Sequence, residues 1–372
     1  MFRTLMITKP MAPPWDDSAK NMARDIVFSV PERRFHLLSI PNHRIGADNA
    51  REEPFYFDVN SGYSPGMWMK MRLFFRMLRP EEIDLVHMFF QPNPLTLKMC
   101  WMAMEIKAHT QSMHTLTCAP GDFTKAAKHL FADRIVTVSR WTAEKLKAEG
   151  VKNISCIYPA VEAPGRSSNE ERRKAREKYG LAEGVPVALF AGDLQSEKLA
   201  EKLVEILAGV EDENLILLVA CRDKTEATPT YKKHLKDLAE KAGLGQRLRM
   251  LSKLEDMPSL FDAVDFQIFP VDDLYGKMDL PLVLMEAMGR GLPVLSADLP
   301  PLRELFPDDS VGRLIAPDDV SAWAAAISEW SKDSSLRDMT GLRSVELMRD
   351  SFSMEKLGRE YEKLYRELEE EK

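Results

Sequence analysis

The sequence predicts an α/β protein of two domains, each with a parallel sheet covered by helices. Its length of 372 residues suits one large or two ordinary domains. Short apolar runs alternate with helical patterns along most of the chain, which is typical of strand–helix repeats around a parallel sheet. A polar stretch at 162–184 interrupts this alternation and indicates a domain boundary near the middle of the chain.

Composition and charge place the chain among globular proteins. Hydrophobic residues make up 45% and charged residues 29%, which leaves enough apolar side chains for sizeable cores. The net charge of −7 is unevenly spread: residues 1–165 hold 21 Lys and Arg against 17 Asp and Glu, a balance of +4, and the remainder balances at −11. A less acidic first half is compatible with contact with an anionic surface there, but a nucleic-acid partner is not indicated.

The four cysteines are scattered and form no CxxC pair, which argues for a reducing compartment and against a zinc site or a disulfide framework. The opening residues, MFRTLMITKP, are too short an apolar run for a signal peptide or a membrane span, and we read them as a first buried strand. We therefore expect a cytoplasmic protein, with peripheral contact at the inner face of a membrane as an open alternative.

A strand at 4–8 leads into a Pro-rich loop and then a helix from Ser18 to about Val30, with Ser18 or Asp17 as its N-cap. This order places a ligand site at the carboxyl end of a parallel sheet. There is no GxGxxG motif, so a dinucleotide cofactor is not expected. Capping and surface roles are as open as a role in this site for each of the loop's candidate residues, which are Asp16, Asp17, Ser18 and Lys20.

The middle of the first half contains a second strand at 35–41, an irregular region at 44–66 and a helix at 67–79. That helix interleaves Trp, Met, Leu and Phe with Lys and Arg. It is either a helix that lies on a membrane surface or an ordinary helix with one buried face and a basic outer stripe, which we prefer. Further strands of this half are expected at 84–89 and 154–159.

The second half opens with a continuous apolar strand at 185–190, typical of a fully buried parallel sheet. Its other elements alternate in the same way, with strands at 215–219 and 265–270 and helices at 231–243 and 258–263. The chain ends in an amphipathic, acidic helix at 353–372.

The stretch 275–304 organises the second half. It reads as a loop, a helix ended by Gly289 and Gly291, and a strand from Pro293. Within the helix, Glu286 stands among apolar residues. Its carboxylate is either an ordinary exposed group, the commoner case, or an acceptor for hydrogen bonds from ligand hydroxyls while the helix start faces an anion.

Glu286-Ala-Met, followed by GLPVL at 291–295, resembles the nucleotide-sugar signature of the retaining GT-B glycosyltransferases of family 4. Residues 132–139, 258–270 and 311–317 resemble further motifs of that family, and the resemblance covers nearly the whole chain. It implies an α/β GT-B fold, in which two Rossmann-like α/β/α domains face each other across a cleft. The implied parts are an acceptor-side domain at 1–165, a nucleotide-sugar-binding domain at 166–353, and a helix at 354–372 that returns to the first domain.

The resemblance implies a glycosyltransferase that moves a sugar from a nucleotide-sugar donor to a hydroxyl of a glycan or lipid-linked acceptor, with retention of the anomeric configuration. It implies no cofactor and no metal, since positive charge and helix N-termini take the metal's place at the diphosphate. Polysaccharide or glycolipid assembly is the family's commonest use. The alternative is a catalytically impaired GT-B protein that binds a nucleotide sugar, or serves as a scaffold, without turnover.

The resemblance also implies roles for donor-binding residues. Glu286 would accept hydrogen bonds from the ribose hydroxyls, and the backbone amides of Leu282 and Val283 would face the donor at the helix start. Lys198 would bind the diphosphate, whose charge grows as the glycosidic bond breaks. Ser252 lies where the family lines the nucleotide base.

Two departures from the family pattern bear on activity. Asp193 stands where the family has an Arg that clamps the diphosphate, so either another base, Lys277 or Lys253, replaces it or the donor site is impaired. Met278 stands at the position of the first Glu of the signature, and Asp279 is the candidate for the missing contact with the donor sugar. His114 corresponds to the family's cleft histidine, so His114 and Asp279 are the expected catalytic residues.

Overall fold

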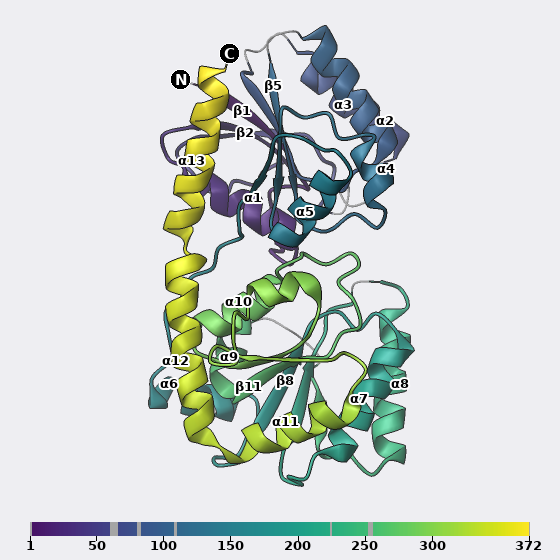
Figure 1. Cartoon of the computed structure of the whole chain (residues 1–372), viewed down its shortest axis with the longest axis vertical. Coiled ribbons are helices and arrows are strands. Elements are labelled where there is room, and N and C mark those ends of the chain that lie inside the picture. The colour runs from purple at the N-terminus through teal and green to yellow at the C-terminus, as the bar shows by residue number, and fades with distance from the viewer. Residues whose placement is uncertain are drawn as a thin grey trace. The chain divides into compact units, whose positions relative to one another are not determined.

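The computed structural model describes residues 2–59, 66–79, 83–107, 110–223, 225–251 and 256–371. They form two compact units, each with a parallel sheet and helices, which confirms the predicted fold class (Figure 1). The first unit contains Met1–Ala160, Leu274–Pro281 and Phe352–Lys372, and the second contains Val161–Asp273 and Leu282–Ser351. The segment 274–281, which the sequence analysis places in the second domain, thus belongs to the first unit.

The first unit is built on a seven-stranded parallel sheet with the order β3-β2-β1-β4-β5-β6-β7. The chain starts in the middle of the sheet, moves outward to β3 and then crosses to β4, so the strand order reverses between β1 and β4. Ligands bind beyond the carboxyl ends of the strands at such a reversal. The strands are β1 (Arg3–Ile7), β2 (Arg34–Ser39), β3 (Ala50–Pro54), β4 (Leu85–Met88), β5 (Gln111–Leu116), β6 (Arg134–Thr137) and β7 (Ile154–Cys156).

Strand β3 corrects the prediction that 44–66 is irregular. Its sequence, AREEP, pairs along its whole length with β2 at the edge of the sheet. An edge strand needs no apolar run, because charged residues and proline at an edge keep it from pairing with other chains. The periodic signal of a buried strand is therefore missing from this segment.

Helices of the first unit are α1 (Ser18–Ser29), α2 (Met67–Met77), α3 (Pro94–Ile106), α4 (Phe123–Ala127), α5 (Arg140–Ala148) and α13 (Met354–Glu370). Asp17 caps α1 by accepting a hydrogen bond from the amide of Lys20, as predicted. Helix α1 packs against α13, and α2 packs against α3. The C-terminal helix α13 therefore lies against the first unit.

The second unit has a six-stranded parallel sheet with the order β10-β9-β8-β11-β12-β13. Every residue of β8 (Val187–Ala191) and β9 (Ile216–Ala220) is buried, which explains their continuous apolar sequences. The other strands are β10 (Leu248–Met250), β11 (Phe266–Phe269), β12 (Val294–Ala297) and β13 (Arg313–Ile315). The helices are α6 (Asn169–Lys178), α7 (Glu197–Gly209), α8 (Thr228–Lys241), α9 (Met257–Ala263), α10 (Leu282–Gly289), the short 3-10 helix η1 (Pro300–Glu304), α11 (Val320–Lys332) and α12 (Ser334–Ser351). Across the described ranges, no helix is both long and apolar enough to span a membrane.

Candidate active site

Asp279 organises the carboxyl edge of the first sheet. Its Oδ1 accepts a hydrogen bond from the amide of Ala119 at 2.7 Å, and its Oδ2 accepts one each from Ser139 Oγ and Thr142 Oγ1 at 2.5 Å. The amide of Asp279 donates to the carbonyl of Thr117 at 3.1 Å. Asp279 is almost fully buried, so the segment 274–281 is tied to the loop after β5 and to the first turn of α5. This structural role was not visible in the sequence, where Asp279 was expected to contact a donor sugar.

The loop after β1 is held by its own charged side chains. Lys20 is buried, and its Nζ donates to the carbonyls of Ala12 at 2.8 Å and Pro14 at 2.6 Å. Asp17 caps α1 and also forms an ion pair with Lys9. Two of the four predicted loop residues thus shape the loop, while Ser18 is the first residue of α1 and Asp16 is exposed.

His114 lies on β5 with no exposed surface. Its Nε2 donates to the carbonyl of Phe90 at 2.7 Å, and its Nδ1 is buried without a hydrogen-bond partner among the described residues. Burial lowers the pKa of His114 to about 4, so the imidazole is neutral near pH 7. A neutral ring with one free lone pair can accept a hydrogen bond but carries no charge.

The neighbouring His87 has both ring nitrogens occupied. Its Nδ1 is 2.8 Å from Tyr365 Oη on α13, and its Nε2 is 2.8 Å from Thr115 Oγ1 on β5. Burial, and to a lesser extent repulsion from His114 when that ring is protonated, holds the pKa of His87 well below its ordinary value. His87 therefore joins β4, β5 and α13 as a structural residue.

Lys198 stands in the first turn of α7, beyond the carboxyl end of β8. Its side chain is 64% exposed, and its Nζ lies 3.1 Å from Asp272 and 3.6 Å from Asp318. Asp272 also pairs with Lys202, whose Nζ donates to the carbonyl of Pro270 at 3.3 Å. Burial would raise the pKa of Asp272, but hydrogen bonds from the two lysines outweigh it and lower that pKa. Sequence reasoning found Lys198 and missed Lys202 and Asp272, which carry no motif.

Arg222 supplies a guanidinium group close to the position where the sequence departs from the family. Asp193 follows β8, Arg222 follows β9, and Arg222 Nε donates to Asp193 Oδ1 at 2.9 Å. The Asp193 side chain is 12% exposed and that of Arg222 is 35% exposed. Because β8 and β9 are adjacent parallel strands, their carboxyl ends bring the two residues together. The signal in the sequence was an acidic residue after one strand and a basic residue after its neighbour.

On helix α10, only Val283 and Glu286 among residues 282–289 are not buried. They are three positions apart and so share one face of the helix. Leu282 is buried in the first turn. Glu286 is therefore the single carboxylate on the partly exposed stripe of this helix, as the ligand-binding interpretation requires.

The predicted donor-binding residues are divided between the two units. Lys198, Leu282, Val283 and Glu286 belong to the second unit, and Lys277 belongs to the first unit together with Asp279 and His114. Ser252 and Lys253 lie outside the described residues. In the part of the chain that the structure describes, no three His, Cys, Asp or Glu side chains are grouped to hold a metal ion.

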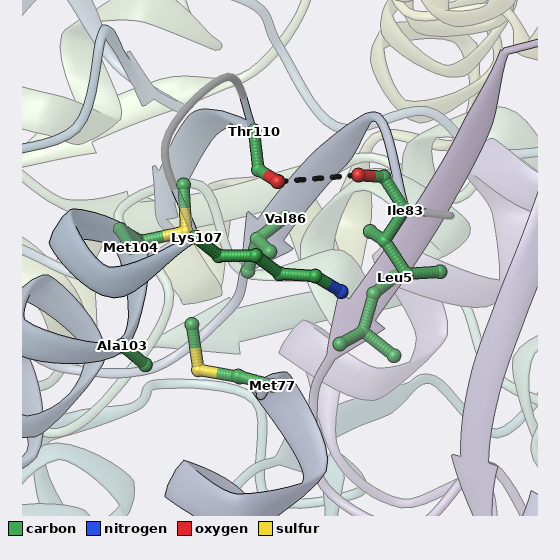
Figure 2. A pocket seen from close by; sticks show the side chains of 8 residues that line it. All are labelled: Leu5, Met77, Ile83, Val86, Ala103, Met104, Lys107 and Thr110. Carbon is green, nitrogen blue, oxygen red and sulfur yellow. Dashed lines mark hydrogen bonds between the residues drawn. The ribbon is translucent and has the colours of Figure 1, made fainter. Parts of the chain in front are cut away.

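A cavity elsewhere in the first unit does not suit a nucleotide sugar. It is lined by apolar side chains from β1, β4, α2 and α3, with Lys107 and Thr110 at its polar side (Figure 2). Its free volume of about 10 Å³ holds no more than a water-sized molecule. The candidate site therefore stays at the carboxyl edges of the sheets.

Comparisons with known proteins show which family and which relatives the chain resembles. The family model described as Glycosyl transferases group 1 matches residues 171–344. A D-inositol 3-phosphate glycosyltransferase from Streptomyces avermitilis is 25% identical over 292 residues, which are 71% of this chain and 61% of that protein. A phosphatidyl-myo-inositol mannosyltransferase from Mycobacterium leprae is 23% identical over 326 residues, 84% of this chain and 80% of that protein. The chain thus spans less than two thirds of the length of the first of these relatives.

Solved structures share the fold over the whole chain. Sucrose-phosphate synthase from Thermosynechococcus elongatus has a TM-score of 0.81 at 17% identity and covers 100% of both chains. HepE from Anabaena in complex with UDP-glucose has a TM-score of 0.77 at 17% identity and covers 99% of this chain and 100% of its own. The chain is thus similar to the group 1 glycosyltransferases in its family match at 171–344 and in its curated relatives, and it shares its fold with solved glycosyltransferase structures.

Proposed function

We propose that this chain transfers a sugar from a nucleotide sugar to an acceptor hydroxyl, with retention of the anomeric configuration and without a metal. The observation that carries the proposal is Glu286 on the partly exposed stripe of α10. A carboxylate there is suited to accept hydrogen bonds from two ribose hydroxyls. Helix α7, which carries Lys198, follows β8, and α10 follows the adjacent strand β11, so both come after neighbouring carboxyl ends.

Lys198 and Arg222 are the bases we propose for the diphosphate. The leaving group gains negative charge as the glycosidic bond breaks, and cations placed in advance stabilise that charge. Both bases are also paired with aspartates in the structure. A bound diphosphate therefore has to share each base with its aspartate or displace that aspartate. Lys277, in the first unit, is the further candidate base, and we keep the backbone amides of Leu282 and Val283 as donor contacts.

No protein nucleophile is required in this proposal. The leaving phosphate takes the proton of the acceptor hydroxyl on the same face of the sugar. We keep His114 as a catalytic candidate through its position at the carboxyl edge of the first sheet: its neutral ring is fully buried, and its Nε2 holds the carbonyl of Phe90 just after β4. The acceptor we propose is a hydroxyl on a glycan or lipid-linked molecule, in line with the relatives named for inositol phosphate and phosphatidylinositol.

The second candidate function is binding of a nucleotide sugar without turnover. It is favoured by Asp193 in place of a base and by the buried Met278 in place of a carboxylate. Under this reading, the ion pairs of Lys198 with Asp272 and Asp318 keep that lysine from the diphosphate.

Incubation with a panel of UDP-, GDP- and ADP-sugars separates the two functions. Thermal stabilisation by one donor together with slow release of its nucleotide, accelerated by an acceptor, is the result expected of a transferase. Stabilisation without release, even with candidate acceptors, would assign the chain to the second function. No response to any donor would contradict both.

A further inference from the structure

Helix α2 is apolar on two faces. Met69, Leu73 and Met77 are buried against the first unit. On the outer side, Trp68 is 70% exposed and Phe75 is 61% exposed. A helix that is apolar all round is ordinarily buried all round. The sequence analysis preferred a single buried face with a basic outer stripe, but the outer face of α2 holds large apolar side chains as well as basic ones.

The neighbouring helix α3 repeats this arrangement. Thirteen large apolar side chains are exposed in the described chain, and nine of them belong to α2, to α3 or to Phe57 before α2. Exposed apolar residues that are scattered singly are normal, whereas a cluster of this kind marks an interaction surface. We call this cluster the α2–α3 surface: Phe57, Met67, Trp68, Met71, Phe75, Leu95, Trp101, Met102 and Ile106.

The two helices form one continuous support for this surface. They pack against each other, and Figure 1 shows them adjacent in the first unit. Lys107 Nζ at the end of α3 donates to the carbonyl of Arg79 just after α2, at 2.6 Å. Figure 2 shows Met77 of α2 and Ala103 and Met104 of α3 around the small apolar cavity. The exposed side chains therefore stand on a preformed surface.

The two helices that carry most of this surface are rich in basic residues, whereas the segment 50–59 around Phe57 holds one basic and three acidic residues. The described stretches 66–79 and 94–107 contain six basic residues and one acidic residue, although the whole chain has a net charge of −7. Arg76 is buried and pairs with Glu53, which also lies 3.6 Å from Arg79. Arg72 lies over the rings of Phe55 at 5.0 Å and Phe57 at 5.2 Å. The basic residues are Lys70, Arg72, Arg76, Arg79, Lys98 and Lys107.

We propose that the α2–α3 surface docks on an anionic lipid bilayer. Tryptophan and phenylalanine enter the boundary between head groups and acyl chains, while lysine and arginine stems extend their charges toward anionic head groups. A second copy of this chain is a poorer occupant, because a twofold contact through the same surface sets basic residues against basic residues. The proposal does not depend on the transferase reaction, since binding to vesicles needs no donor sugar.

Vesicle flotation tests the proposal with the full chain. Vesicles of phosphatidylcholine with phosphatidylglycerol are compared with phosphatidylcholine alone, at low and at high salt. We expect the chain to float with the anionic vesicles and to be released by salt, because salt screens the attraction between the basic residues and the lipid. Absence of flotation with anionic vesicles at low salt would overturn the proposal.

Matched variants assign binding to the surface. Trp68→Ala/Phe75→Ala removes two exposed apolar side chains and should weaken partition by at least about tenfold. Lys70→Glu/Lys98→Glu should weaken partition into anionic vesicles, also by a factor of about ten, and should not change partition into vesicles of phosphatidylcholine alone. The control Met339→Ala/Leu342→Ala removes two exposed apolar residues of α12 and should bind like the unmodified chain. Equal binding by all variants would overturn the assignment.

Sedimentation velocity and thermal melting complete the test. All variants change exposed or half-exposed side chains, so unchanged melting temperatures are expected. One outcome would overturn the proposal: the unmodified chain does not bind vesicles and forms a dimer, and the dimer dissociates in Trp68→Ala/Phe75→Ala. That result would show that the α2–α3 surface joins two copies of the chain. Stabilisation by a nucleotide sugar, measured on the same variants, reports separately on the donor site.

Discussion

Arg222 Nε donates a hydrogen bond to Asp193 Oδ1 over 2.9 Å and so joins the carboxyl ends of strands β9 and β8. Asp193 is the acidic residue that interrupts the family pattern of basic residues at this edge. Its hydrogen-bond partner, Arg222, follows the adjacent strand β9 and places a guanidinium group at the same edge of the sheet. Arg222 is therefore our proposed replacement, from a different strand, for the base that the sequence lacks at this edge.

Substitution of this pair should change nucleotide binding in opposite directions. Arg222→Ala should weaken binding of a nucleoside diphosphate by about 1.5–3 kcal/mol, because a charge-assisted hydrogen bond is lost. Asp193→Asn should strengthen it, because a carboxylate that repels phosphate becomes neutral. Isothermal titration with the nucleotide found in the donor panel measures both, and Lys236→Ala on the exposed side of α8 is the control. If Arg222→Ala, Asp193→Asn and Lys236→Ala all bound the nucleotide with the same affinity, Arg222 would not be a donor-binding residue.

Glu286→Ala should weaken nucleotide binding by about 1–3 kcal/mol through the loss of hydrogen bonds to the ribose. Glu286→Gln should fall between this variant and the unmodified chain, since the amide oxygen still accepts. The same titration measures both, and Glu346→Ala on the exposed side of α12 serves as the matched control. A Glu286→Ala variant that binds with unchanged affinity would contradict the assigned role.

Asp279→Ala should lower stability by about 3 kcal/mol, because it leaves two buried hydroxyls and the half-buried amide of Ala119 without their acceptor. Asp279→Asn keeps the shape and one acceptor oxygen, so its loss should be smaller. Urea unfolding monitored by circular dichroism measures the change, with the exposed Asp309→Ala as control. If stability were unchanged and only turnover fell, Asp279 would act on substrate alone.

His114 should make stability depend on pH in acid. Its pKa falls from 6.5 to about 4 on folding, so the unfolded state binds more protons between these values. The free energy of unfolding therefore rises with pH across this window, and the contribution of His114, about 3 kcal/mol, is complete above 6.5 and is lost as the pH falls toward 4. His87 acts in the same direction, since burial also lowers its pKa.

His114→Gln tests this effect without removing the side-chain donor. Urea titrations at several pH values give the slope of the unfolding free energy against pH. In that window the slope should fall by the amount that corresponds to about one bound proton. A slope equal to that of the unmodified chain would show that His114 does not change its proton affinity on folding.

Much of the fold follows from local patterns. The apolar run at 185–190 became β8 at 187–191, the pattern at 67–79 became α2 at 67–77, and the last helix lies at 354–370. These elements were predictable because their buried faces impose a periodic apolar sequence. The edge strand β3 was missed because its position leaves it polar.

The sequence by itself determined the α/β class, the strand–helix order and the candidate carboxylate Glu286, since each of these is written in neighbouring residues. Only the tertiary structure decided the partners of the site residues. Asp279 meets Ser139 and Thr142 from 140 and 137 positions away, and Arg222 meets Asp193 from 29 positions away. Such contacts depend on which strands are adjacent, and adjacency is set by the packing of the whole sheet.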